Sequence, residues 1–187
     1  MVGLLISGLT AWVVSTTPAL MALVFSVPLV YIIMFAPLVM IFFFYGKLQN
    51  ASASGAQLWF WIFAFLEGLM LSSLAVHYTG QSIVGVFFIT SAMFAGLSAH
   101  GYTTKRDLSG MGKFLLMALI GLIIVMVVNI FMASTALGTL ISVAAVVIFS
   151  MLITYDTQRI KEDFISNGGE VNNAAVQGAL SLYLDFL

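Results

Sequence analysis

Three carboxyl side chains lie where an ionised group is expensive. Glu67, Asp156 and Asp185 each interrupt an apolar stretch, in a chain of 187 residues with six basic and seven acidic residues. An ionised carboxylate in the hydrocarbon of a membrane costs about 3 kcal/mol or more, so such a group must be protonated, paired or in contact with water. These three positions are therefore the first candidates for a functional site.

Asp156 is predicted to lie near the end of the sixth apolar segment, and Asp185 about eleven residues into the last one. Asp156 precedes Arg159 by three residues, so a local ion pair with Arg159 is one explanation for it. Asp185 has no basic residue near it in sequence. The polar connection 159–173 is long enough for the two helices to be antiparallel neighbours, and the two carboxyl groups would then meet.

A pair formed by Asp156 and Asp185 would act as a proton switch. Two carboxylates in contact cannot both ionise cheaply, so they share a proton and respond to pH. The pair would also offer Ca²⁺ a weak site, because calcium normally takes about 6–8 oxygen ligands. The alternative is that each carboxyl group is satisfied separately by other partners.

Glu67 lies near the centre of its apolar segment, close to the expected bilayer midplane. It is either a neutral side chain hydrogen-bonded to Ser or Thr of a neighbouring helix, or part of an ion pathway. The sequence leaves both interpretations open.

The composition identifies the environment of these groups. With 62% hydrophobic residues, 7% charged residues and a mean hydropathy of +1.15, the chain cannot cover a soluble globule of its size. It is predicted to be an integral membrane protein whose partner is the lipid bilayer, with no nucleic acid and no cofactor. The absence of cysteine excludes disulfides, thiolate metal sites and cysteine nucleophiles.

Seven apolar segments, too long for barrel strands, predict an all-α bundle of seven transmembrane helices. We expect a single transmembrane domain over 1–187 that is truncated at both ends, with Pro18 in a loop. Small residues four apart, such as Gly68 and Ser72 or Ala92 and Gly96, favour close helix packing. The segments are about 1–15, 24–45, 58–79, 82–102, 112–132, 136–158 and 174–187.

The basic residues predict an orientation. All of them fall in alternate connections, and the intervening connections contain none. By the positive-inside rule the basic loops are cytoplasmic and the N-terminus is inside. These residues are Lys47, then Lys105, Arg106 and Lys113, then Arg159 and Lys161.

The chain also resembles a known family, the transmembrane Bax inhibitor motif (Bax inhibitor-1) proteins, in a bacterial form. The most specific matching stretches are 101–109 (GYTTKRDLS), 155–158 (YDTQ) and 182–187 (LYLDFL). Softer support comes from 3–11 (GLLISGLTA) and 67–69 (EGL). The resemblance extends essentially from end to end.

The resemblance implies a seven-helix fold with the last helix central, and a pH-sensitive calcium leak across the membrane. Its pH-sensing aspartates match Asp156 and Asp185, and calcium would be the transported ion. The family also has a basic residue that latches onto the first of these aspartates; Lys47 and Arg159 are the candidates here. A bacterial member would reside in the inner membrane.

Two other functions stay open. Bacterial members of the resembling family include modulators of membrane protein quality control, so the chain would then bind a membrane-protein partner without transport of its own. The paired aspartates also superficially resemble those of intramembrane aspartyl proteases. The Gly-x-Gly-Asp context of those enzymes is replaced here by Leu-Tyr-Leu-Asp at 182–185, so no enzyme activity is expected.

Overall fold

A computed structural model describes residues 2–48, 53–168 and 173–187. This part of the chain is helical and contains no strand, which confirms the predicted all-α class. The helices are α1 (Val2–Thr16), α2 (Pro18–Val24), α3 (Leu29–Leu48), α4 (Ala53–Leu71), α5 (Leu74–His77), α6 (Gly80–Thr103), α7 (Met111–Met132), α8 (Thr135–Ser166) and α9 (Asn173–Phe186).

Four of the described helices, α4, α6, α7 and α8, are long and apolar enough to cross a membrane, and α1 with α2 would add a fifth, broken span. The predicted number of seven spans is not confirmed. The outward side chains are apolar: on α7, Met117, Ile130 and Phe131 are 73%, 75% and 85% exposed. A helix that is apolar on its outer face fits contact with lipid.

The first two helices differ from the prediction. Residues 16–23 were expected to form a loop, but α2 begins at Pro18 and meets α1 at an angle of 107°. A residue before proline is forced out of the helical region, and Thr17 has the extended φ of −112° and ψ of 103°. Proline fits the first turn of a helix, so Pro18 starts α2 where the sequence suggested only a break.

The segment predicted at 58–79 is two helices. Its first part, α4, begins earlier and ends at Leu71, and α5 starts at Leu74. Between them the Ser72 hydroxyl donates to the Leu69 carbonyl at 2.6 Å, and Ser73 donates to Met70 at 2.7 Å. Hydroxyl groups that bond to nearby carbonyls compete with helical hydrogen bonds, and two successive serines that do so lie at this interruption.

The chain groups into two compact units. Unit 1 comprises Met1–Phe88 and Asn172–Tyr183, and unit 2 comprises Ile89–Val171 and Leu184–Leu187. Helix α9 therefore contributes most of its length to unit 1 and its last residues to unit 2. The single domain and the central position of the last helix stay predictions.

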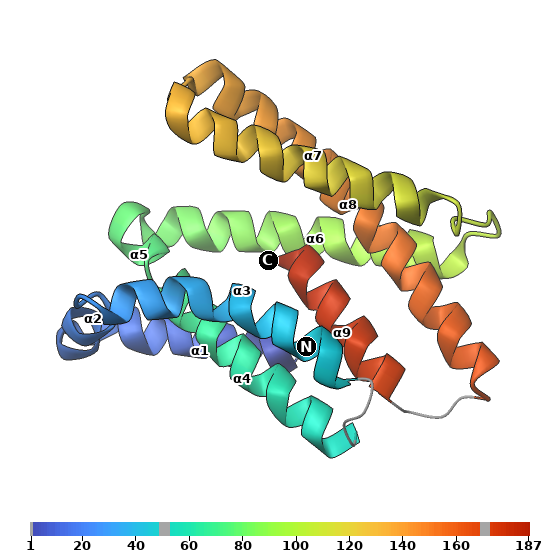
Figure 1. Ribbon diagram of the computed structural model, residues 1–187, viewed down its shortest axis with the longest axis horizontal. Helices are drawn as coiled ribbons and strands as arrows, with labels where there is room; N and C mark the ends of the chain where they lie inside the picture. The colour runs from blue at the N-terminus through green and yellow to red at the C-terminus, as the bar shows by residue number, and fades with distance from the viewer. Residues whose placement is uncertain (1, 49–52, 169–172) are drawn as a thin grey trace. The chain divides into compact units, whose positions relative to one another are not determined.

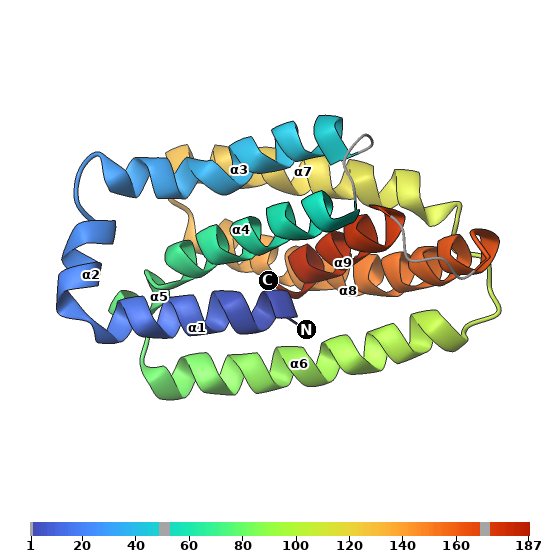
Figure 2. The ribbon, with the colours of Figure 1, turned by 90° about the horizontal axis from the view of Figure 1, so that it is seen from below.

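In unit 1, α4 packs against α1 and α3, as Figure 2 shows. Gly68 makes the approach of α1 possible: a Cβ atom there would lie 2.7 Å from the Ser7 carbonyl oxygen and 2.7 Å from Thr10 Cβ. Val14, Val24 and Ile33 form a small buried core where α1, α2 and α3 meet. The predicted close packing at Gly68 and Ser72 is thus observed, since both are buried.

In unit 2, α7 and α8 form an antiparallel hairpin, visible in Figure 1. Ala133 has a φ of +47°, and Ser134 caps α8 by accepting a hydrogen bond from Leu137 N–H. The close helix contact is at Gly101, whose missing side chain leaves room for the Thr154 backbone of α8. Gly96 was also predicted to pack closely, but a Cβ atom added there would meet no atom within 4 Å, so this glycine faces open space.

Candidate functional site

The aspartates of α8 and α9 lie together in unit 2. The Asp156 and Asp185 side chains are close enough to interact electrostatically, and both residues are partly buried. Two carboxylates at close range repel each other, so such a pair favours keeping one proton. The two residues are therefore candidates for a proton-sharing pair.

The end of α9 is held in unit 2 by apolar packing next to the pair. The Phe186 ring meets the Phe94 ring of α6 edge to face, with centroids 5.5 Å apart. One oxygen of Asp185, Oδ2, is buried and has no hydrogen-bond partner among the described residues. A buried acceptor without a partner is costly, so this oxygen is where a proton or a cation would be most stabilising.

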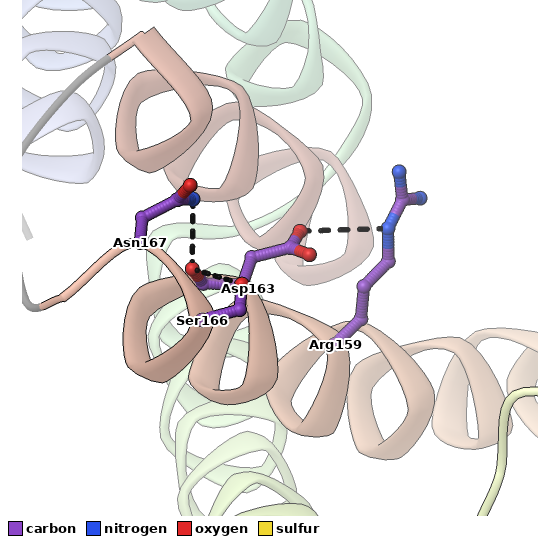
Figure 3. A network of polar contacts seen from close by, with 4 residues as sticks. All are labelled: Arg159, Asp163, Ser166 and Asn167. Atoms are coloured by element: carbon purple, nitrogen blue, oxygen red, sulfur yellow. Dashed lines mark hydrogen bonds and ion pairs between the residues drawn. The ribbon is translucent and has the colours of Figure 1, made fainter.

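Of the two predicted latch residues, the structure describes the side chain of Arg159 alone. Arg159 Nε lies 3.8 Å from Asp163 Oδ2, one turn further along α8, and both side chains are more than half exposed (Figure 3). Arg159 is nevertheless close enough to act electrostatically on Asp156. The side chain of Lys47 lies outside the described residues. A latch on Asp156 stays a prediction for both residues.

Gln158, two residues after Asp156, clamps the loop between α6 and α7 onto α8. Its Oε1 accepts a hydrogen bond from Leu108 N–H at 2.9 Å, and its Nε2 donates to the Arg106 carbonyl at 2.8 Å. Gln158 is 6% exposed. The amide thus satisfies one donor and one acceptor of the loop at once.

Lys161 adds a second connection to the same region. Its ammonium group donates to the Tyr102 carbonyl at 2.7 Å and lies 4.7 Å from the centre of the Tyr102 ring. The extension of α8 to Ser166 makes both connections possible, and it places Asp156 well inside the helix. The helical composition of residues 159–163 agrees with this extension.

Glu67 belongs to unit 1, with different neighbours. It is partly buried on α4, in the same unit as Tyr183 of α9. The Tyr183 ring contacts Phe60 and Phe63 edge to face, with centroid distances of 5.5 and 6.0 Å. Ser7 of α1, which is 1% exposed, lies close to the Tyr183 hydroxyl.

Sequence reasoning did not assign roles to Gln158, Ser7 and Tyr183. A glutamine two residues after a membrane aspartate was a visible signal for the clamp. The sequence supported only the general expectation that Glu67 meets a Ser or Thr of another helix, which includes Ser7 but not Tyr183. Which hydroxyl group that is depends on helix packing, which no local pattern specifies.

Among the described residues, no three His, Cys, Asp or Glu side chains lie together as ligands for a metal ion. A cation at Asp156 and Asp185 would therefore depend on water or backbone oxygens for its remaining ligands. Calcium takes about 6–8 oxygens, so the pair could hold it only weakly.

The described helices are long and apolar, and their exposed side chains are mostly hydrophobic. These features define a helical membrane protein with several spans. The sequence profile of the family described as "Inhibitor of apoptosis-promoting Bax1" matches residues 1–187. The chain belongs to this family, the Bax inhibitor-1 family, as the resemblance indicated.

Similar proteins occur in several bacteria. A protein of Caulobacter vibrioides is 42% identical over 99% of this chain and 79% of its own length. A protein of Rickettsia prowazekii is 41% identical over 98% of this chain and 79% of its own length. The inner membrane protein YbhL of Escherichia coli K12 is 37% identical over 100% of this chain and 82% of its own length.

Proposed function

We propose that this protein is a pH-sensitive leak channel for calcium, gated by the proton shared between Asp156 and Asp185. The observation that carries the proposal is the approach of these two carboxyl groups in unit 2. With the proton in place, the pair ties α8 to the end of α9 and holds the path closed. Its loss leaves two like charges in contact, which repel each other and favour separation of the helices.

The weakness of the pair as a metal site fits a leak better than storage. A conducting path must bind its ion strongly enough to admit it and weakly enough to release it. Two carboxylates with an unpartnered oxygen on Asp185 provide attraction without a complete calcium cage among the described residues. Glu67 and the latch candidates Arg159 and Lys47 are further groups that this function would use.

The location and orientation belong to the same proposal. The similarity to an inner membrane protein of Escherichia coli supports a place in a bacterial inner membrane. The clustering of all basic residues in alternate connections supports cytoplasmic basic loops.

Calcium flux into proteoliposomes, measured across pH, tests the proposal. We expect wild-type flux to rise as the pH rises, because deprotonation separates the pair. Asp156→Asn and Asp185→Asn should each flatten this profile, since an amide cannot lose the shared proton. Glu162→Gln is the matched control, because Glu162 is an exposed carboxylate on the same helix and should leave the profile unchanged.

A pH profile that is unchanged in both pair variants would exclude the gating role. A second outcome is that folded wild-type protein conducts no calcium and co-purifies with a membrane protein in stoichiometric amount. That result would favour the partner-binding regulator. Cleavage of a test transmembrane substrate that depends on both aspartates would favour the protease.

A further inference from the structure

A second polar cluster, in unit 1, is built around the hydroxyl group of Tyr183. The residue is 4% exposed, and its hydroxyl makes no hydrogen bond within the described part of the chain. The neighbouring Ser7 hydroxyl donates its own hydrogen to the Gly3 carbonyl at 2.8 Å. A fully buried phenol usually finds a polar partner, so the Tyr183 hydroxyl marks a place where a polar ligand would be stabilised.

Glu67 lies on the face of α4 that carries the two rings in contact with Tyr183. Phe60 and Phe63, which hold the Tyr183 ring, are seven and four residues before Glu67. Residues with these spacings lie on one face of a helix, so Glu67 continues the face that meets Tyr183. The electrostatic effect of Glu67 on Tyr183 agrees with this arrangement.

The packing around the cluster is tight. Gly68 leaves no room for a Cβ atom against Ser7, and a Cβ atom on Gly3 would lie 2.6 Å from the Phe60 ring and 3.1 Å from the Tyr183 ring. Ser7, Phe63 and Ala64 are each at most 2% exposed. Helices α1, α4 and α9 thus pack closely around Ser7 and Tyr183.

No positive charge is available to balance an ionised Glu67 from the helices that form the cluster. Helices α1 and α2 contain no titratable side chain, α4 contains Glu67 alone, and residues 173–183 of α9 contain Tyr183 alone. Helix α3, which also packs on α4, carries Tyr31, Tyr45 and Lys47. Lys47 precedes α4 in the sequence, and Glu67 lies roughly 21 Å along that helix from its first residue at about 1.5 Å per residue.

We propose that Ser7, Glu67 and Tyr183 form a proton-binding site in which Glu67 carries one exchangeable proton and the two hydroxyl groups stabilise the carboxylic acid. The ligand is a proton, because one carboxyl group and two hydroxyl groups fall short of the oxygen shell of a metal cation. The site is separate from the aspartate pair and does not depend on the proposed channel function. The site makes the packing of α9 against α1 and α4 responsive to pH.

The physical reason is the cost of an uncompensated charge. Removal of the proton leaves a carboxylate beside the Phe60, Phe63 and Tyr183 rings, with no cation on the helices that form the cluster. Such a charge has to recruit water or draw away from the cluster, and either change loosens the contact of Tyr183 with α4.

Infrared difference spectroscopy during a pH titration of the protein in lipid nanodiscs tests this site. We expect a carboxylic-acid carbonyl band that titrates, is lost completely in Glu67→Gln and persists in the double variant Asp156→Asn/Asp185→Asn. Tyr183→Phe should shift its titration midpoint on the order of one pH unit, which is about the free energy of one hydrogen bond. Glu162→Gln is the control, because Glu162 is exposed near the end of α8.

Two results would overturn the assignment. One is a spectrum in which Glu67→Gln removes no acid band at any pH at which the protein stays folded. The other is a Glu67 band whose midpoint is the same in wild type, Tyr183→Phe and Ser7→Ala. Because these two hydroxyl variants retain Glu67, they keep the test decisive if Glu67→Gln does not fold.

Discussion

Units 1 and 2 both bury acidic groups in apolar helices, but they surround them differently. In unit 1 a single carboxyl group, Glu67, lies beside Gly68, which packs closely against Ser7. In unit 2 two carboxyl groups, Asp156 and Asp185, face each other beside a polar clamp. The first carboxyl group has closely packed uncharged neighbours, and each of the other two has a second carboxyl group nearby.

These two surroundings imply that a proton can act on a membrane helix contact in two ways. Hydroxyl neighbours carry no charge at any ordinary pH, so they do not repel an ionised carboxyl group, and loss of its proton acts only through the cost of a buried charge. Two facing carboxyl groups attract while they share a proton and repel once it is gone. Deprotonation would therefore loosen the seat of α9 in unit 1, but it would drive the helices apart in unit 2.

Adding one methyl group should destabilise the close contact between α1 and α4 in unit 1. Gly68→Ala would place a Cβ atom against the Ser7 backbone, and we expect a loss of about 3 kcal/mol of unfolding free energy. Gly96→Ala in unit 2 is the control: nothing lies near its Cβ position, so the better helix former should be neutral or stabilising by up to about 1 kcal/mol. Unfolding by SDS in mixed micelles measures both variants. Equal effects at the two glycines would contradict the contrast.

Removing the clamp should loosen unit 2 without touching the carboxyl groups. Gln158→Ala leaves Leu108 N–H and the Arg106 carbonyl without their partner, and we expect a cost of about 1–2 kcal/mol. Hydrogen exchange at the Leu108 amide should accelerate accordingly. Gln81→Ala, an exposed glutamine in the first turn of α6, should change neither quantity. An unchanged Leu108 exchange rate in Gln158→Ala would show that the clamp does not hold the loop.

The smallest expected effect is in the clamped loop itself. The Ser109 backbone N–H donates to Asp107 Oδ1 at 2.8 Å, and this hydrogen bond lowers the pKa of the Asp107 carboxyl. A lowered pKa stabilises the loop at pH values above the unfolded pKa, and the stabilisation is lost as the pH falls through the folded pKa. Exchange of the Ser109 amide, corrected for its intrinsic rate, should therefore quicken only in acid.

Asp107→Asn provides the comparison for that measurement. Its amide oxygen can still accept the hydrogen bond, but it does not titrate. The acid-induced increase in Ser109 exchange should disappear in this variant. Persistence of the increase would assign it to another group, such as the aspartate pair.

The sequence predicted the helical segments well because long apolar runs have few alternatives. The predicted segments 112–132 and 82–102 nearly coincide with α7 and α6. Local rules at Pro18 and at Ser72 and Ser73 were misjudged: the proline starts a helix, and the two serines interrupt one. Where these helices begin and end depends on single residues, and the hydropathy of a segment does not reveal their effect.

The candidate site was predictable only in part. The length of the 159–173 connection indicated that Asp156 and Asp185 could meet, because it permits an antiparallel return. The partners of Glu67 were not predictable, since they lie on α1 and α9, far from it in sequence. The four-residue spacing of small residues was also a limited guide to helix packing, because Gly68 packs tightly while Gly96 faces open space.

The exposed end of helix α8 is a place where a probe of the aspartate pair can be attached. Its 32 residues extend roughly 48 Å, whereas the hydrocarbon core of a bilayer measures about 30 Å, so its charged final turns belong outside the core. The chain contains no native cysteine. A single thiol introduced at Glu162 would therefore accept a spin or fluorescent label on the same rod as Asp156, and would register movement of that rod without altering either acid.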